Sequence, residues 1–304
     1  MMNYIIGVDA GGTKTEAIAY SLEDQELGIG LSGYGNLYMN YDKATEHIIQ
    51  AIEQCRINAC GKGAEECLGI YLGIAGIEVQ DYAAKIDALL TNQYHCRVCG
   101  LHDSVLAHAA ILGGEDGIVT LSGTGSVAFG LYKGKHATTG GWGHVLGDEG
   151  SGYHIALQAF KRMTLEEDLG LRRSRLTQTL FKALHLGKVN DLKGFVHSAD
   201  KGKIAAYAAM VAELAEASDE VSMEILKQAG KDLALMTQRL YPKLGIHEPV
   251  PVGVSGSILE QIHIVRHEFK HCLEREVGLT DLIINQVSVT KGACYLHKKE
   301  TRCE

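Results

Sequence analysis

The chain has 304 residues, of which 46% are hydrophobic and 22% charged, so it is long enough for about two domains and too apolar for a disordered protein. Its formal net charge is −8 and it contains no Lys- and Arg-rich run, which argues against nucleic acid and anionic membranes as partners. Glycine occurs 36 times and proline 3 times, which excludes collagen-like or proline-rich sequence and indicates backbone that turns tightly or approaches a ligand.

The N-terminal segment 1–9 has no basic region and reaches an aspartate after a few apolar residues, unlike a signal peptide. The longest uncharged stretches, such as 117–132, are shorter than the roughly 20 apolar residues of a membrane-spanning helix. The eight cysteines are scattered, which favours reduced thiols. Cys96 and Cys99 have CxxC spacing inside a strand-like run, so their side chains face opposite sides and a metal or redox role is disfavoured. We therefore expect a cytoplasmic protein with no membrane contact.

The first third of the chain predicts strands followed by alternating helices and strands. An apolar run, 4–9, ends at a glycine pair and is followed by two strand-like runs, 15–22 and 27–32. Apolar residues spaced by three and four then predict a helix over 43–59. The remaining elements are expected to be strands at 67–74 and 96–101 and helices at 81–90 and 104–112.

At Gly117 the pattern of strand, Gly/Thr turn and strand begins again, with strands at 118–121 and 127–132. A helix follows at 153–163, an apolar stripe from Val221 to Leu240 predicts a long helix, and strands are expected at 250–254 and 282–287. These patterns predict an α/β protein of two similar halves joined by a narrow hinge. The predicted domains are 1–114 and 115–290, with a C-terminal helix at 291–304 packing back on the first domain.

Two glycine turns occupy matching positions in the two halves. Both turns offer backbone N–H groups and hydroxyls that can surround an anion. The first is Asp9-Ala10-Gly11-Gly12-Thr13-Lys14-Thr15 and the second is Ser122-Gly123-Thr124-Gly125-Ser126. Neither has P-loop spacing, and each alone is as compatible with a plain hairpin turn. Their matching positions favour two loops that hold the phosphates of one nucleotide.

Two aspartates lie where strands are predicted to end. Asp9 can orient Mg²⁺ through water, because Mg²⁺ favours one or two carboxylates plus water, or it can simply cap the turn. Asp103 can accept a proton from a hydroxyl nucleophile, although frequency alone favours a helix N-cap.

The stretch from Gly140 to Gly152 contains six glycines, Asp148 and Trp142, which is the single tryptophan of the chain. Such a loop can surround a small polyol with backbone N–H groups, a carboxylate and an apolar ring; alternatively it is an irregular connection with Trp142 as a core residue. Near the C-terminus, Gly253 to Ile258 again runs from strand to glycine turn to helix, where a flat ring can approach the backbone.

Together these segments resemble the superfamily of sugar kinases, actin and Hsp70. Within it they resemble the N-acetylglucosamine kinase-like branch of the BadF/BadG/BcrA/BcrD ATPase family, which also holds activator ATPases of reductases. Asp9–Thr15 and Leu121–Ser126 resemble the two phosphate motifs, Gly253–Ile258 the adenosine motif, and Gly73–Gly76 with Lys291–Ala293 the two connecting segments. The resemblance implies two ribonuclease H-like (actin-like ATPase) domains with an interdomain cleft. Gly140–Tyr153 is most similar to the kinases and favours a kinase over an activator.

The resemblance also implies roles for individual residues. Asp103 would be the general base, Asp9 would position Mg²⁺, and ATP would contact Gly11, Gly12, Thr13, Lys14, Gly125, Ser126, Gly256 and Ser257. The sugar would contact Asn36, Thr124, Gly140, Gly141, Trp142 and Asp148. Asn36 is followed by Leu37-Tyr38-Met39-Asn40, which departs from the family pattern and leaves further sugar contacts open.

We therefore expect ATP-dependent phosphorylation of an amino sugar, with ATP and Mg²⁺ as cofactors, at the 6-hydroxyl of N-acetylglucosamine, glucosamine or N-acetylmuramic acid. The alternative is a regulatory ATPase that drives electron transfer into a reductase. An actin-like polymer and a sugar-sensing repressor are weaker alternatives. The oligomeric state stays open, with a homodimer as the first hypothesis.

Overall fold

The computed structural model describes residues 2–78, 81–279, 281–284 and 286–301. The chain divides into two compact units: unit 1 comprises Met1–Val119 and Asn285–Glu304, and unit 2 comprises Thr120–Ile284. The domain limits predicted from the sequence, at residues 114 and 290, differ from this division by a few residues and stay a prediction.

The centre of unit 1 is a five-stranded mixed sheet with the strand order β3-β2-β1-β4-β5. The first three strands form an antiparallel meander, and β4 and β5 add to it in parallel with β1. The strands are β1 (Met2–Ala10), β2 (Thr15–Ser21), β3 (Glu26–Ser32), β4 (Ala64–Ile74) and β5 (Arg97–His102). The predicted order, three strands followed by alternating helices and strands, is confirmed.

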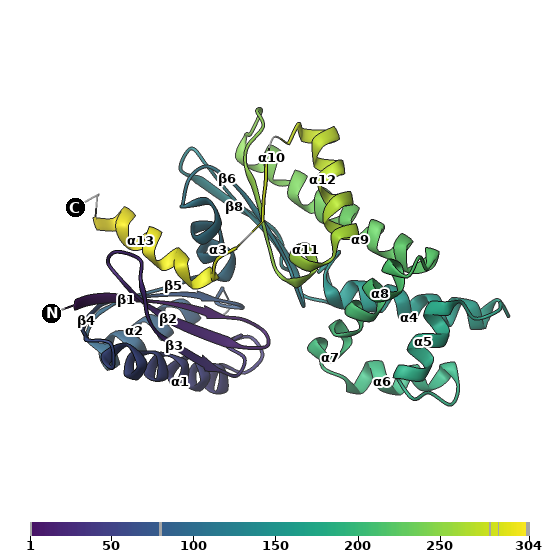
Figure 1. Cartoon of the computed structure of the whole chain (residues 1–304), viewed down its shortest axis with the longest axis horizontal. Helices are drawn as coiled ribbons and strands as arrows, with labels where there is room; N and C mark the ends of the chain where they lie inside the picture. The colour runs from purple at the N-terminus through teal and green to yellow at the C-terminus, as the bar shows by residue number, and fades with distance from the viewer. Residues whose placement is uncertain (1, 79–80, 280, 285, 302–304) are drawn as a thin grey trace. The chain divides into compact units, whose positions relative to one another are not determined.

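Helices cover both faces of this sheet because the side chains of β1 alternate between two apolar clusters. Ile6 belongs to the cluster that contains Ile52 of α1, whereas Ile5 belongs to the cluster that contains Leu106 of α3 and Ala293 of α13. Figure 1 shows α1 and α2 on one side of the sheet and α3 and α13 on the other. These elements are α1 (Tyr41–Cys60), α2 (Tyr82–Tyr94), α3 (Asp103–Leu112), η2 (Val289–Lys291) and α13 (Gly292–Thr301).

Unit 2 repeats the same sheet. Its strand order, β10-β9-β6-β7-β8, is that of unit 1 read from the other edge, with β6 in the place of β1. The strands are β6 (Gly117–Ser122), whose first residues are assigned to unit 1, β7 (Ser126–Tyr132), β8 (Lys135–Gly140), β9 (Val252–Ser255) and β10 (Leu282–Ile284). The internal repeat predicted from the two glycine turns is therefore confirmed at the level of topology.

The second copy contains many helices between its hairpin and its last two strands. The predicted apolar stripe is divided between two helices, because α9 ends at Gln238 and Leu240 begins α10. The helices of unit 2 are α4 (Gly152–Asp168), α5 (Arg175–Ala183), η1 (Val189–Asp191), α6 (Leu192–Ser198), α7 (Lys201–Ala205), α8 (Tyr207–Glu216), α9 (Glu220–Gln238), α10 (Leu240–Leu244), α11 (Ser257–Gln261) and α12 (His263–Val277).

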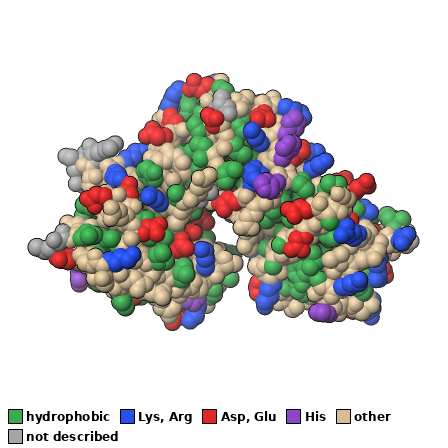
Figure 2. Space-filling view, viewed as in Figure 1, with side chains coloured by type: hydrophobic (Ala, Val, Ile, Leu, Met, Phe, Trp, Pro, Cys, Tyr) green, Lys and Arg blue, Asp and Glu red, His purple; other side chains and the backbone are tan. Residues whose placement is uncertain are grey.

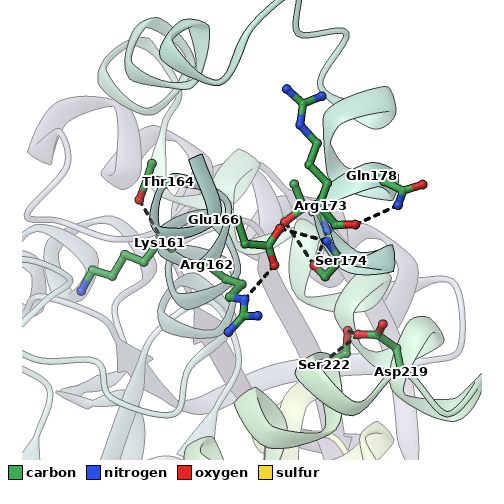
Figure 3. A network of polar contacts seen from close by, with 10 residues as sticks. Lys161, Arg162, Thr164, Glu166, Arg173, Ser174, Gln178, Asp219 and Ser222 are labelled. Carbon is green, nitrogen blue, oxygen red and sulfur yellow. Dashed lines mark hydrogen bonds and ion pairs between the residues drawn. The ribbon is translucent and has the colours of Figure 1, made fainter. Parts of the chain in front are cut away.

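A buried carboxylate joins α4 to the start of α5. Glu166 accepts hydrogen bonds from Arg162 Nε at 2.8 Å and from the backbone N–H of Ser174, the N-cap of α5, at 2.9 Å. Figure 3 shows this carboxylate between the two helices. Burial alone would raise the pKa of Glu166, but these hydrogen bonds outweigh it and lower the pKa.

The visible surface carries both signs of charge. Lys and Arg side chains are interspersed with Asp and Glu on the face of each unit that Figure 2 presents. Among the residues that the structure describes, no helix has both the length and the apolar character needed to cross a bilayer.

Candidate functional site

Three parallel strands of unit 1 end beside one another and bring Asp9 close to Asp103. Asp9 of β1 is in register with Gly73 of β4, and β4 is in register with β5 up to its last residue, His102. A Cβ on Gly73 would lie 3.2 Å from the Cα of Asp103, so β4 can approach the start of α3 only with glycine there. Carboxyl ends of parallel strands are the usual place for ligands in α/β sheets.

The first glycine turn connects β1 to β2 and leaves its backbone open on one side. The Gly11 N–H donates to the Lys14 carbonyl at 3.0 Å, which closes the turn. A Cβ on Gly12 would meet no atom of the described residues within 4 Å, and the φ of Gly12 is not in the left-handed region. Neither packing nor backbone conformation therefore requires glycine at this position. Close approach of a ligand to the backbone would explain it.

The side chains of this turn divide into two groups. Thr13 and Lys14 are exposed, and the Lys14 ammonium pairs with Glu16 Oε1 at 3.2 Å. Thr15 is buried and donates its hydroxyl proton to the Gly33 carbonyl at 2.8 Å. The expectation that the Thr15 hydroxyl is a phosphate donor is wrong, because that hydroxyl positions the 33–35 segment.

Asn36 lies next to the first turn, because the Gly35 N–H donates to the Gly11 carbonyl at 2.9 Å. The Oδ1 of Asn36 accepts from the Tyr38 N–H at 2.9 Å, which fixes the side chain. Gly76, with φ +76°, packs against this amide: a Cβ there would lie 2.8 Å from the Asn36 Oδ1. Unit 1 thus gathers Asp9, the first turn, Asn36 and Asp103.

Negative charge accumulates around Asp9. Burial and the nearby carboxylates of Asp103 and Glu16 raise the pKa of Asp9 to about 7, although Lys14 opposes this shift. A divalent cation would relieve this repulsion, so the residues fit Mg²⁺. No cluster of three His, Cys, Asp or Glu side chains suited to a metal occurs in the described part of the chain. Mg²⁺ at Asp9 would therefore take most of its ligands from water and phosphate.

His102 and Glu78 are neighbours of Asp103 that the sequence analysis missed. The His102 ring pairs through Nδ1 with Asp103 Oδ1 at 2.9 Å and through Nε2 with Glu78 Oε1 at 2.7 Å. Burial alone would lower the pKa of His102, but its two carboxylate partners outweigh burial and raise the pKa to about 10. The ring of His102 therefore lies between two carboxylates, Asp103 and Glu78. A histidine directly before an aspartate at a predicted strand end is a sequence pattern that could have pointed to His102. No sequence pattern points to Glu78.

The helix N-cap of α3 is His102, and Asp103 is the first residue of the helix. The alternative interpretation, in which Asp103 caps the helix, is therefore wrong. The side chain of Asp103 is half-buried at the end of β5, where its carboxylate is paired with His102.

The second glycine turn, between β6 and β7, is anchored to the start of α4. The Gly123 N–H donates to the Gly125 carbonyl at 3.0 Å, and the Gly152 N–H donates to the Gly123 carbonyl at 2.8 Å. Ser122 is buried, and its hydroxyl donates to the Gly150 carbonyl at 2.9 Å. The turn and the 148–152 segment thus form one hydrogen-bonded structure.

Ser126 contributes both of its donors to that structure. Its N–H donates to Asp148 Oδ1 at 3.1 Å and its hydroxyl to the Glu149 carbonyl at 2.8 Å. This geometry assigns Ser126 to the shaping of the turn. Thr124, at the tip, is half-exposed.

Gly256 and Ser257 lie beside the second turn. Gly256 has φ +95°, and a Cβ on it would lie 2.5 Å from the Ser122 carbonyl oxygen, so β9 and β6 end in direct contact. A Cβ on Gly123 would lie 3.9 Å from the Ser257 hydroxyl. The residues of unit 2 that we predict to bind ATP are therefore gathered at one end of the sheet.

The 140–152 loop leaves β8 through two glycines with positive φ, +74° at Gly140 and +75° at Gly141. Trp142 is 74% exposed, so the alternative interpretation of Trp142 as a core residue is wrong. Asp148 has φ +63° and is 3% exposed, in contrast to the exposed Glu149 beside it. The loop thus presents an apolar ring and shields a carboxylate.

Lys201 is a third functional candidate, after His102 and Glu78, that the sequence analysis missed. Its ammonium pairs with Asp148 Oδ2 at 2.7 Å and lies 2.7 Å from the position of a Cβ on Gly125. Lys201 begins α7, far along the chain from both partners, and no motif marks it.

Cys96 lies just before β5, not inside it, and Cys99 lies within the strand. Cys96 packs against the cluster that contains Ile52 and Cys99 against the cluster that contains Leu106, so the predicted placement on opposite sides is confirmed. The Cys96 sulfur interacts with the Cys67 thiol of β4, which lowers the pKa of Cys96.

Sequence comparison finds relatives that match nearly the whole chain. An N-acetylmuramic acid/N-acetylglucosamine kinase of Clostridium acetobutylicum is 28% identical over 98% of this chain and 99% of its own. An N-acetyl-D-glucosamine kinase of Dictyostelium discoideum is 28% identical over 84% of this chain and 85% of its own. A glucosamine kinase of Vibrio cholerae is 24% identical over 86% of this chain and 87% of its own.

Structural comparison agrees on the fold. A candidate N-acetylglucosamine kinase of Chromobacterium violaceum superposes with a TM-score of 0.80 at 23% identity, covering 97% of this chain and 99% of the other. A glucokinase of the ROK family from Streptomyces griseus, solved with glucose and an ATP analogue, gives a TM-score of 0.63 at 15% identity, covering 97% and 98%. The predicted α/β class with two similar domains is thus confirmed.

A family model describes the chain over nearly its whole length, residues 6–295. This range includes both glycine turns, Asp103 and the 140–152 loop, and the predicted resemblance to the family is confirmed. The chain belongs to the BadF/BadG/BcrA/BcrD ATPase family.

Proposed function

We propose that the chain is an ATP-dependent amino-sugar kinase that phosphorylates the 6-hydroxyl of N-acetylglucosamine or a close relative. The observation that carries this proposal is the placement of Asp103 beside Asp9 and the first glycine turn, where three parallel strands end. The names of the three relatives support the choice of substrate class. The relative that matches end to end is named for both N-acetylmuramic acid and N-acetylglucosamine, so these two sugars are the first to test.

In the proposed reaction Asp103 is the general base. Its carboxylate accepts the proton of the sugar hydroxyl while that oxygen bonds to the terminal phosphorus of ATP, and the bond from this phosphorus to the bridging oxygen breaks to release ADP. The pairing with His102 orients the Asp103 carboxylate. Asp9 would hold Mg²⁺ through water, and the ion would supply positive charge to the phosphates.

The remaining predicted residues divide by ligand. ATP would contact Gly11, Gly12, Thr13 and Lys14 of unit 1 and Gly125, Gly256 and Ser257 of unit 2. The hydroxyl and the backbone N–H of Ser126 are both engaged within the protein, so Ser126 would shape the turn. The sugar would contact Asn36, Thr124, Gly140, Gly141, Trp142 and Asp148. We also propose a homodimer as the oligomeric state.

The test is ADP release with ATP and Mg²⁺ across N-acetylglucosamine, N-acetylmuramic acid and glucosamine, with glucose as comparison. We expect saturable, sugar-dependent ADP formation with at least one amino sugar, and a product phosphorylated at C6 by ³¹P NMR. ADP release that is the same with and without every sugar would contradict the proposal.

A further inference from the structure

Lys201 lies where the residues proposed for ATP meet those proposed for the sugar. Its ammonium is 2.7 Å from Asp148 Oδ2, and it covers Gly125 so closely that a Cβ there would be 2.7 Å away. Asp148 also accepts from the Ser126 N–H of the same turn. One lysine side chain therefore touches both the carboxylate and the second glycine turn.

The burial of the pair points to a ligand. The side chain of Asp148 is 4% exposed, whereas that of Lys201 is 32% exposed. An ammonium has three donors, and Asp148 occupies one side of it. Lys201 thus keeps accessible surface while it is paired, unlike a lysine enclosed in a purely structural ion pair.

Charge complementarity identifies that ligand. The first turn contains its own lysine, Lys14, whereas Ser122 to Ser126 contains no charged residue. The donors of Ser126 are engaged within the protein, so that residue offers none to an anion. Lys201 supplies from α7 the cation that the second turn lacks.

We propose that Lys201 binds the terminal, transferred phosphate of ATP, as a catalytic residue delivered by the helical segment of unit 2. The inference rests on the proposed kinase function. Positive charge at this phosphate stabilises the charge spread over its oxygens during transfer, and Lys201 keeps Asp148 compensated before the nucleotide binds.

The experiment compares Lys201→Met with Lys203→Met, an exposed lysine of the same helix that pairs only with Asp200 among the ion pairs of the described residues. Affinities are measured by calorimetry for ADP and for an ATP analogue with a non-transferable terminal phosphate. For Lys201→Met we expect the analogue to bind about 10- to 100-fold more weakly, the value of a charge-assisted hydrogen bond, and ADP to bind as in wild type. Lys201→Arg should restore much of the analogue's affinity, and Lys203→Met should change neither.

Three results would overturn the inference. Equal weakening of ADP and the analogue would show no contact with the terminal phosphate. If Lys201→Met weakened the binding of neutral sugars alone, Lys201 would be a positioning residue for Asp148. If the variant weakened the binding of N-acetylmuramic acid alone, which carries a carboxylate, the anion that Lys201 binds would be that carboxylate of the sugar.

A second measurement needs only the wild-type protein. Lysine amines are labelled with an acylating reagent and read by peptide mass spectrometry, with Lys203 as internal reference. We expect the ATP analogue to slow labelling of Lys201 more than ADP does, and equal labelling with both nucleotides would contradict the proposal. Wild-type protein without sugar-dependent ADP release would instead refute the proposed function itself.

Discussion

Asp103 shows how much of a residue's chemistry depends on its neighbours in space. By frequency, an aspartate at the start of a helix is an N-cap, but in this chain His102 takes that position. The Asp103 carboxylate therefore does not cap the helix and pairs with His102 instead. Glu78 pairs with the second ring nitrogen of His102 and completes a carboxylate–imidazolium–carboxylate chain.

Replacing the base tests this assignment. Asp103→Asn keeps the shape of the side chain but removes its ability to accept a proton, so we expect kcat for sugar phosphorylation to fall about 10²- to 10⁴-fold. Binding of the ATP analogue should change little. Asp42→Asn, at an exposed position in α1, is the matched control and should turn over as wild type. Near-normal turnover of Asp103→Asn would remove Asp103 from the mechanism.

The pairing of His102 predicts a pH-dependent stability. The pKa of His102 rises from 6.5 to about 10 on folding, so the folded state binds the extra proton between these values. The stabilisation is complete below pH 6.5 and is lost as the pH rises through about 10. We expect His102→Gln to lower the free energy of unfolding by about 1.5–3 kcal/mol near pH 6.5, and by progressively less towards pH 10.

Urea unfolding at several pH values measures this difference. His271→Gln, at an exposed position in α12, is the control for removal of a histidine as such. A difference between wild type and His102→Gln that stays constant from pH 6.5 to 10 would contradict a charged His102.

At the scale of elements, the helical segment of unit 2 places Lys201, and α4 supports that segment. α7 packs against α4, and Glu166 of α4 binds the N-cap backbone of α5. Because the carboxylate is buried and accepts from both Arg162 and Ser174, its loss leaves donors without their acceptor.

We expect Glu166→Gln to lower the free energy of unfolding by about 1–3 kcal/mol at pH 7. The pKa of Glu166 is lowered on folding, so its contribution is present above the ordinary value of 4.5 and is lost as the pH falls below it. Glu167→Gln is the control, since that exposed side chain reaches Arg173 only at 3.9 Å and should stay within about 0.5 kcal/mol of wild type. Equal effects of the two changes, measured by thermal and urea unfolding, would contradict a structural role for Glu166.

Elements were predictable where the pattern is local. The 43–59 helix is confirmed because Ala44, Ile48, Ile52, Cys55 and Ala59 are all buried. The short helices α5 to α8 and the strand β8 escaped prediction, because five to ten residues carry too few periodic positions to stand out. Two interpretations that weighed a residue by its type alone, Trp142 as core and Asp103 as a cap, are wrong.

At the scale of the whole molecule, the repeat explains why much of the candidate site could be read from the sequence. Each sheet places a glycine turn between its first two strands, so Gly11–Lys14 and Gly123–Ser126 occupy equivalent positions. Glu78 and Lys201 could not be found in this way, because each meets its partner only through the fold.

If both turns bind the same nucleotide, hydrogen exchange should report it in both units. With Mg²⁺ and the ATP analogue, we expect amide exchange to slow in peptides covering 11–14 and 123–126, because bound ligand stabilises the segments that contact it. Removing Mg²⁺ with EDTA should weaken this protection, most of all near Asp9, and abolish phosphorylation until Mg²⁺ is restored. Peptides from α12 are the internal reference. Protection confined to one of the two turns would contradict the assignment of a phosphate-binding loop to each unit. This outcome does not depend on the role of Asp103.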